Sequence, residues 1–223
     1  AAIGNHEVKS HFSDDPTYAP NFYTLFENTR REHAYWVFDV GEYLSLLILD
    51  SSHTTAIPGR QTEWLEETLA ARTDRSHVAV AYHIPAYPSA LGFDDRGRGS
   101  VRRDIRDQWT PLFERFGVNV VFEHDDHAYK RTHPLRGGKP APEDGVLYVG
   151  DGAWGQGPRD AKTSAERPYL ATSSSALHVS TVTLTPDGNQ RFRVVGPDGR
   201  LIDRFDVEGE IVAERLDRTP AND

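Results

Sequence analysis

Three short segments of the sequence carry side chains that can bind a metal ion. Asn5 and His6 stand in a Gly-Asn-His-Glu run, His83 follows a short apolar run, and Asp125 and His127 follow another. Neutral imidazoles, carboxylates and an amide oxygen suit borderline or hard divalent ions and also ferric iron. Two such ions about 3.5–4 Å apart can hold a phosphate group and activate a water for attack. The residue types therefore indicate metal-assisted phosphate chemistry.

The elements that must position these side chains follow an alternating pattern. Nearly continuous apolar runs, typical of strands covered on both faces, alternate with segments of helical periodicity. Residues 8–34 lack a clean period, and we expect a long loop there with a short helix around Tyr23–Glu27. The expected strands are 35–40, 43–49, 78–82, 118–122 and 146–150, and the expected helices open near Gly59 and span 101–116. This order predicts an α/β layered fold.

From residue 145 onward, strands and tight turns replace the helices. We expect a meander of three strands at 179–185, 190–195 and 201–207, because Pro-Asp-Gly turns separate them. Residues 208–223 are predicted to be a polar tail. No linker divides residues 1–207, so we expect one domain there.

The candidate ligands fall where predicted strands end. His83 ends the strand at 78–82, and Asp125 and His127 come directly after the strand at 118–122. Loops beyond the carboxyl ends of strands are where α/β sheets assemble binding sites. The apolar residues 1–3 can be the end of a third such strand, which would bring Asn5 and His6 to the same edge.

Composition narrows the possible functions. The chain has 223 residues, a formal net charge of -9 and no cysteine, which excludes disulfides and thiolate metal sites. The negative charge argues against a nucleic-acid-binding surface, and no apolar run of about 18 residues is present to span a membrane. The chain also has no methionine, which predicts an interior or processed piece of a longer protein.

Five segments in order carry a resemblance to a known family. They are Gly4–Glu7, Leu49-Asp50-Ser51 with the Gly59-x-Gln61-x-x-Trp64-Leu65 run, Tyr82–Tyr87, Asp125–Arg131, and Val149–Gly155. Together they resemble the calcineurin-like metallophosphoesterases, most closely the purple acid phosphatase branch. The resemblance runs from residue 1 to about 207.

The resemblance implies a fold and a reaction. The expected fold is the C-terminal majority of a four-layer α/β/β/α sandwich that ends in the β meander. The expected activity of the intact parent is hydrolysis of phosphate monoesters, or of diesters or nucleotides, by a metal-activated hydroxide. The implied cofactors are two metal ions, iron paired with zinc, manganese or iron, and the implied location is outside the cytoplasm. Oligomeric state does not follow from the sequence.

The resemblance also implies a role for each residue that matches the family pattern. Asn5 and His83 would bind one metal ion and His127 the other, while His6 would face the substrate phosphate and Glu7 would orient its neighbours. Arg131 can approach the phosphate or hold the site loop, although a surface position is common for arginine. His11, His33, His53 and His77 are expected to have structural or solvent roles.

Two departures from the family pattern matter. An imidazole ligand of the family is replaced here by Asp125, which is either a substitute ligand or a lesion that weakens one metal. In an extended segment Asp125 and His127 would point to the same side and His124 away. The family's upstream aspartate motifs have no counterpart in this sequence. The competing hypothesis is therefore an inactive or single-metal fragment that binds phosphate weakly.

Overall fold

The computed structural model describes residues 1–9, 15–26 and 33–207, so the expected tail at 208–223 lies outside the described residues. Part of the expected loop at 8–34 also lies outside them, as does Glu27. The short helices near the start are η1 (Pro16–Tyr18) and α1 (Pro20–Leu25), the latter close to the predicted position. The other helices are α2 (Arg60–Ala70), η3 (Asp95–Gly97), α3 (Gly99–Asp104), η4 (Ile105–Trp109) and α4 (Thr110–Arg115).

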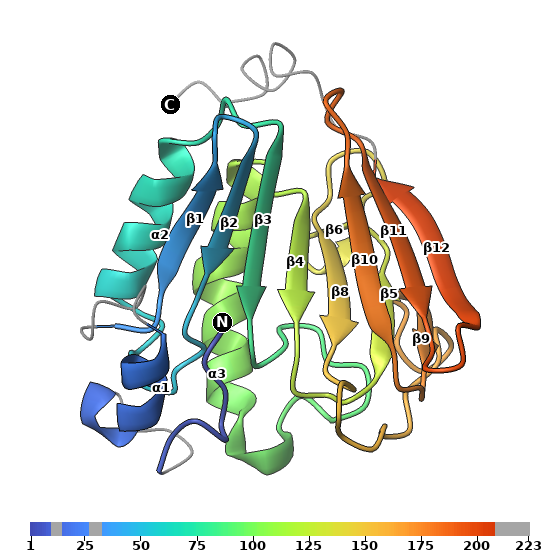
Figure 1. Ribbon diagram of the computed structural model, residues 1–223, viewed down its shortest axis with the longest axis horizontal. Coiled ribbons are helices and arrows are strands. Elements are labelled where there is room, and N and C mark those ends of the chain that lie inside the picture. The colour runs from blue at the N-terminus through green and yellow to red at the C-terminus, as the bar shows by residue number, and fades with distance from the viewer. Residues whose placement is uncertain (10–14, 27–32, 208–223) are drawn as a thin grey trace.

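A seven-stranded sheet forms the centre of the molecule, in the order β1-β2-β3-β4-β8-β5-β9. Strands β2, β3, β4 and β8 run parallel, so their carboxyl ends lie at one edge of the sheet. Figure 1 shows these four arrows pointing the same way, with the chain start lying in front of them. The strands are β1 (Trp36–Val40), β2 (Leu44–Ile48), β3 (His77–Tyr82), β4 (Val120–Glu123), β5 (Tyr129–Thr132), β8 (Leu147–Asp151) and β9 (Leu170–Ser174).

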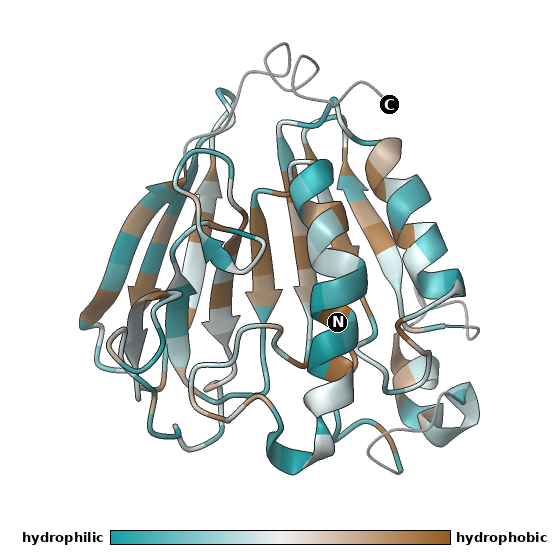
Figure 2. Cartoon of the chain, turned by 180° about the vertical axis from the view of Figure 1, so that it is seen from behind, coloured by the Kyte–Doolittle hydropathy of each residue, from teal (hydrophilic) through white to brown (hydrophobic). Residues whose placement is uncertain are grey.

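Helices cover one face of this sheet. Alternate residues of the strands, among them Leu47, Val80 and Val121, point to this face and pack against the helix side chains Leu65, Trp109 and others in one buried cluster. The view from behind shows α2 and the α3–α4 helix in front of the sheet, running roughly along its strands (Figure 2). The predicted strands and helices of residues 35–122 are therefore confirmed.

The helix predicted at 101–116 contains a π-helical turn. Helix α3 continues through η4, which is π-helical, into α4. Pro111 has no backbone N–H to donate inside a helix, and a single π turn accommodates such a loss. The predicted stripe stays buried through the turn, because Val101, Ile105, Trp109 and Phe113 all lie in the core.

A small antiparallel sheet packs against part of the opposite face. It consists of β10 (Val179–Leu184), β11 (Gln190–Val195) and β12 (Leu201–Val207), which is the predicted meander. Phe192 and Val194 of this sheet join Val120, Leu147 and Val149 of the large sheet in a second core cluster. The α/β sandwich is confirmed, and the described residues contribute three of its expected four layers. A two-stranded hairpin, β6 (Leu135–Arg136) and β7 (Lys139–Pro140), lies outside these layers.

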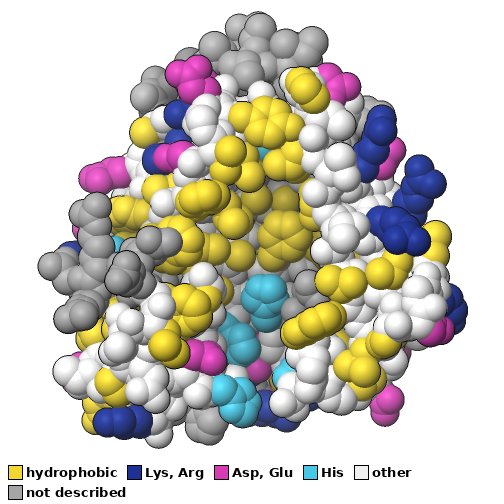
Figure 3. Space-filling model, viewed as in Figure 1, with side chains coloured by type: hydrophobic (Ala, Val, Ile, Leu, Met, Phe, Trp, Pro, Cys, Tyr) yellow, Lys and Arg dark blue, Asp and Glu magenta, His cyan; other side chains and the backbone are white. Residues whose placement is uncertain are grey.

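Beside the small sheet, part of the same face remains exposed. Phe38 and Val40 of β1 are 49% and 45% exposed. They alternate along the strand with residues that point toward the helices, so they lie on the other face of the sheet. Leu46 of β2 lies opposite Phe38 in the register. We call this the apolar face of β1–β2. Figure 3 shows hydrophobic side chains gathered over this region, with histidines below them.

Two expectations about the chain's elements are wrong. Residues 1–4 form no strand; instead, Ile3 is buried against Phe22, Tyr23 and Ala34 in a small separate cluster. Strands β5 and β9 were not expected, and they extend the large sheet beyond β8. Within the described residues, no helix is both long and apolar enough to cross a membrane.

Candidate metal site

The Gly4–Glu7 segment forms a turn that its own carboxylate closes. The Gly4 backbone N–H donates to Glu7 Oε2 at 2.8 Å, and the Glu7 N–H donates to the Gly4 carbonyl at 3.2 Å. A side chain at Gly4 would lie 3.0 Å from the His83 ring. The turn therefore rests directly on His83, and Glu7 shapes the turn, which agrees with its expected orienting role.

Three of the predicted metal ligands converge at the carboxyl edge of the large sheet. His83 Nε2 lies 2.8 Å from Asn5 Oδ1 and 3.3 Å from Asp125 Oδ1. The Asp125 side chain is only 2% exposed and that of His83 only 18%. The structure therefore brings together an amide oxygen, an imidazole nitrogen and a carboxylate oxygen from the chain start, the end of β3 and the end of β4. We call this group the Asn5–His83–Asp125 cluster.

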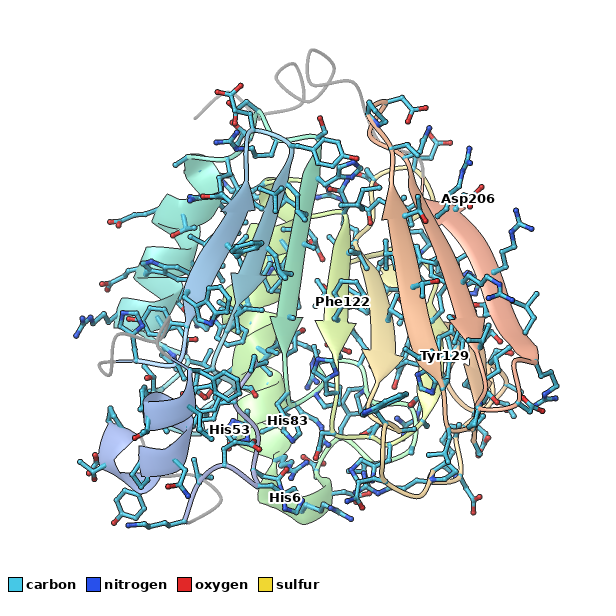
Figure 4. The ribbon with its side chains drawn as sticks, viewed as in Figure 1. His6, His53, His83, Phe122, Tyr129 and Asp206 are labelled. Carbon is cyan, nitrogen blue, oxygen red and sulfur yellow. The ribbon has the colours of Figure 1, made fainter. Side chains whose placement is uncertain are left out.

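His53 also reaches this edge, although sequence reasoning assigned it to a background role. Its ring is buried and lies 5.3 Å from the His83 ring, centroid to centroid. Asp50, at the end of β2, accepts the His53 backbone N–H at 2.7 Å, and its carboxylate lies 3.4 Å from His53 Nδ1. Figure 4 shows His53 and His83 next to each other at the lower ends of the strands, with His6 further down. The position of His53 shortly after a buried strand was the signal that could have identified it as part of this edge.

Burial sets the charge of the cluster. Desolvation, followed by the neighbouring His53 and His124, lowers the pKa of His83 well below its usual value. His83 is therefore a neutral imidazole at neutral pH, the form that ligates metals.

Asp125 is held by two arginines that the sequence did not single out. Its carboxylate forms an ion pair with Arg98, whose side chain is 4% exposed, and its carbonyl accepts a hydrogen bond from Arg159 Nη1 at 2.5 Å. Burial, with help from Arg102 and Arg96, lowers the pKa of Arg98 to about 10, so the guanidinium remains a cation at neutral pH.

The segment from Asp125 to His127 is not extended, so the expected alternation of its side chains does not apply. Asp125 and His127 have positive φ values of 68° and 50°. Left-handed conformations are uncommon for residues other than glycine, and they concentrate at functional sites. The close approach of Gly152 accounts for the tight packing here, since a Cβ there would lie 2.8 Å from the His127 nitrogen.

Two buried carboxylates near Asp125 anchor the loop after β3 rather than face the cluster. Asp126 Oδ2 accepts the backbone N–H groups of Ser89 and Ala90 at 2.5 and 2.7 Å. Glu123 Oε1 accepts from the Ala86 N–H at 2.7 Å, and its other oxygen pairs with Lys130 Nζ at 2.5 Å. These contacts fix the loop that begins at His83.

His127 and His6 lie near each other at the exposed side of the site. Burial first, and then Arg159 and Arg96, lower the pKa of His127. His6 is also among the groups that act on His127, and its side chain is exposed. Among the described residues, no group of three or more His, Cys, Asp or Glu side chains comes together as a metal site. The three-residue cluster is compatible with this because one of its members is an asparagine.

Arg131 lies at the contact between β5 and the small sheet. Arg131 Nε donates to Asp203 Oδ2 at 2.8 Å, and its guanidinium stacks 4.6 Å from the Phe205 ring centroid. It therefore joins β5 to the small sheet instead of facing the cluster, which corrects its assignment to substrate binding. Trp154 is 76% exposed, so it has no core role.

The donor set fits one metal ion. Asn5, His83 and Asp125 offer the nitrogen and oxygen donors that zinc, manganese and iron accept in proteins. His127 has arginines beside it, and in the described part of the chain no second carboxylate or imidazole group completes a second site around it. The described residues therefore fit the ion expected at Asn5 and His83, and among them no donor set for a second ion comes together.

Comparison with solved structures identifies the fold. The chain superposes on the purple acid phosphatase PPD1 from yellow lupin (Lupinus luteus) seeds with a TM-score of 0.74, at 18% sequence identity, over 93% of this chain and 40% of that one. The chain shares the fold of this purple acid phosphatase. PhoD and GAP50, the anchor in the inner membrane complex of Plasmodium, are similar in fold as well, with TM-scores of 0.53 and 0.55 and identities of 14% and 13%. The resemblance predicted from the motifs is confirmed at the level of the fold.

Sequence comparisons agree but cover less. No family model matches the chain. An uncharacterized protein of Mycobacterium tuberculosis is 39% identical over 82 residues, which is 35% of this chain and 15% of that protein. Purple acid phosphatase 18 of Arabidopsis thaliana is 31% identical over 96 residues, which is 41% of this chain and 21% of that protein. The match thus spans less than a quarter of each of these relatives.

Proposed function

We propose that the polypeptide containing this chain hydrolyses phosphate monoesters in a metal-dependent reaction. The observation that carries the proposal is the convergence of Asn5, His83 and Asp125 within 3.3 Å of one nitrogen. It occurs at the edge of the sheet where α/β folds bind ligands, in a fold shared with a purple acid phosphatase. Phosphodiesters and nucleotides remain within the substrate class.

Each residue of the cluster has a defined part in holding the ion. His83 offers Nε2 as a neutral imidazole, because burial lowers its pKa. Asn5 offers its amide oxygen from a turn whose shape Glu7 fixes, and Asp125 offers Oδ1. A metal ion bound there would polarise a phosphoryl oxygen and make a neighbouring water more acidic.

His6 is the residue that we assign to the substrate. The His6 side chain is exposed and lies near His127, whereas the His83 side chain is only 18% exposed. From there His6 can donate a hydrogen bond to a phosphoryl oxygen or a proton to the leaving group. The positive charges of Arg96 and Arg159 also act on His127, so this side of the site favours an anionic ligand. His127 remains the proposed donor for a second ion.

The binuclear centre of iron with zinc, manganese or iron is a proposal for the whole polypeptide, as is export from the cytoplasm. The chain spans 40% of the matched lupin phosphatase. A second candidate function is a single-metal, phosphate-binding protein without turnover. The donor set favours this reading for the described residues, because it fits one ion.

The test measures metal content and hydrolysis together. We expect Asn5→Ala and His83→Ala each to lower bound metal and p-nitrophenyl phosphate turnover by at least about 10-fold, since each removes one of three donors. His133→Ala is the matched control, because His133 is exposed and follows the last residue of β5, at the opposite end of that strand from Tyr129. We expect it to change neither quantity.

The two candidate functions give different results. Stoichiometric metal without turnover in the complete polypeptide supports the phosphate-binding candidate and contradicts the enzyme. Metal content that is unchanged in both Asn5→Ala and His83→Ala contradicts the site itself.

A further inference from the structure

One side chain beside the cluster has no part in the proposal so far. Arg98 is an almost fully buried cation, and its carboxylate partner is Asp125, whose side chain is equally buried. Asp125 stands where the family resemblance places an imidazole. The charged residue that replaces the imidazole is therefore in contact with a buried residue of opposite charge.

The chain places Arg98 there through a tight turn. Arg96 and Gly97 have positive φ values of 58° and 67°, and helix α3 begins at Gly99 directly afterwards. A side chain at Gly99 would collide with Asp94 Oδ1 at 2.3 Å. The Arg98 carbonyl accepts the Arg102 N–H at 2.9 Å as the first hydrogen bond of the helix. The backbone of Arg98 is therefore fixed at a helix start, which limits where its guanidinium can lie.

The neighbouring charges have other partners. Asp126 accepts backbone N–H groups of the loop at 89–90. Arg102 Nη1 donates to the carbonyls of Phe93 and Asp95 at 2.9 and 3.2 Å. Arg159 reaches the carbonyl of Asp125, not its carboxylate. The charge on the Asp125 side chain is thus balanced by Arg98.

We propose that Arg98 is a positioning residue that makes Asp125 the electrostatic equivalent of a neutral imidazole ligand. The carboxylate brings one negative charge to the cluster and the guanidinium returns one positive charge. The ion pair holds Oδ2, which leaves Oδ1 directed toward His83 Nε2. Hydrogen-bonded partners of this kind orient the ligands of metal sites and tune the affinity for the ion. The inference rests on the proposed metal site at Asn5, His83 and Asp125.

Replacing Asp125 by the imidazole that the family resemblance places there should not by itself improve metal binding. Asp125→His supplies the imidazole but leaves Arg98 as a buried cation without its carboxylate, close to where the metal ion would bind. Like charges at such distances repel strongly in a poorly solvated site. Asp125→His alone should therefore bind metal no more tightly than the unmodified chain does.

The test is a double-mutant cycle on Zn²⁺ affinity, measured by calorimetric titration of the full chain with the metal alone. We expect Arg98→Met to tighten Zn²⁺ binding by about 10-fold or more in the Asp125→His background. Arg103→Met is the control, because Arg103 is an exposed arginine of helix α3, next in the chain to the buried Arg102 that acts on Arg98. It should leave the affinity unchanged in both backgrounds.

Two results would overturn the proposal. One is an Asp125→His protein that binds Zn²⁺ at least about 10-fold more tightly than the unmodified chain while Arg98 is in place. The other is an Arg98→Met effect that is absent in the Asp125→His background. Arg98→Gln repeats the cycle with an uncharged polar side chain, so that poor packing of methionine does not decide the result. Circular dichroism and thermal unfolding confirm that each variant is folded.

The same titrations separate this proposal from the proposed function. If Zn²⁺ binds and Asn5→Ala weakens it, the metal site stands, and only the role of Arg98 is at stake. If no variant binds Zn²⁺, both the site and the role assigned to Arg98 are wrong.

Discussion

At the scale of single residues, the cluster depends on small distances between groups that are far apart in the sequence. Asn5 and His83 come within 2.8 Å because the turn at Gly4 can lie directly against the imidazole ring. A glycine is needed at that point for close approach rather than for an unusual backbone angle. The metal affinity should therefore respond to a single added methyl group.

Gly4→Ala tests this contact. The new Cβ would lie 3.0 Å from the His83 ring and from Glu7 Oε2, so the ring or the turn must shift. We expect the Zn²⁺ affinity to fall on the order of 10-fold, measured by calorimetric titration. Gly157→Ala is the control, since nothing lies within 4 Å of a Cβ there. Equal affinities for the two variants would mean that the turn does not position His83.

Single residues also show the limit of the sequence prediction. His83 and Asp125 were predictable because ligand-type side chains at strand ends meet at one edge, whereas Asn5 was expected there from the Gly-Asn-His-Glu run although no strand precedes it. Arg98 and the backbone angles of Asp125 and His127 were not. Neither an ion pair between residues 27 positions apart nor a left-handed aspartate leaves a local pattern in the sequence. Arg131 was misplaced because its partner, Asp203, lies on a strand 72 residues away.

At the scale of elements, the loop after β3 is held by buried carboxylates that come from the end of β4. Glu123 pairs with Lys130 of β5, and both side chains are at most 1% exposed. Lys130 Nζ also donates to the Tyr87 carbonyl in the loop. One ion pair thereby joins β4, β5 and the loop that begins with His83.

Lys130→Met tests how much this junction contributes. It leaves Glu123 as a buried carboxylate without its cation, and we expect a loss of about 3–5 kcal/mol in the free energy of unfolding, measured with urea. Arg115→Met is the control, because Arg115 and Glu66 form an exposed pair on the helices. Its expected cost is below about 1 kcal/mol. Similar costs for both variants would contradict a structural role for the buried pair.

The elements themselves were largely predictable, with clear exceptions. The buried strands β2, β3 and β4 and the helix from Gly99 to Arg115 have strong apolar periodicity, which local sequence reveals. Strands β5 and β9 were missed because Tyr-Lys-Arg-Thr and Leu-Ala-Thr-Ser-Ser lack that pattern. Their pairing depends on the neighbouring strand rather than on their own composition.

At the scale of the whole molecule, the small sheet is joined to the large one by an apolar cluster and a polar bridge. Asp203 of β12 accepts hydrogen bonds from the Tyr129 hydroxyl at 2.6 Å and from Arg131 Nε at 2.8 Å, both on β5. Figure 4 shows Tyr129 at the lower half of the strands of the small sheet. Burial raises the pKa of Asp203, but the bonds from Arg131 and Tyr129 outweigh it and leave the pKa below its usual value.

Asp203→Asn should reveal this bridge through its pH dependence. A carboxyl group with a lowered pKa in the folded state stabilises the protein above the unfolded-state pKa of about 4, and this contribution is lost as the pH falls below it. We therefore expect the variant to be less stable at pH 7, with the difference shrinking below about pH 4. Urea midpoints across this range measure it.

The matched control for that experiment is Asp206→Asn, since Asp206 is exposed on the same strand. We expect it to change the midpoint little at any pH. A constant difference between Asp203→Asn and the unmodified chain down to about pH 2 would contradict the bridge.

The apolar face of β1–β2 has a consequence for handling the protein in solution. With a net charge of -9 at neutral pH, repulsion between copies opposes association through Phe38 and Val40. That repulsion vanishes near the isoelectric point, about 5.6. Mildly acidic buffer thus removes the colloidal protection of the chain. Turbidity recorded beside each rate would distinguish precipitation from a true loss of catalysis.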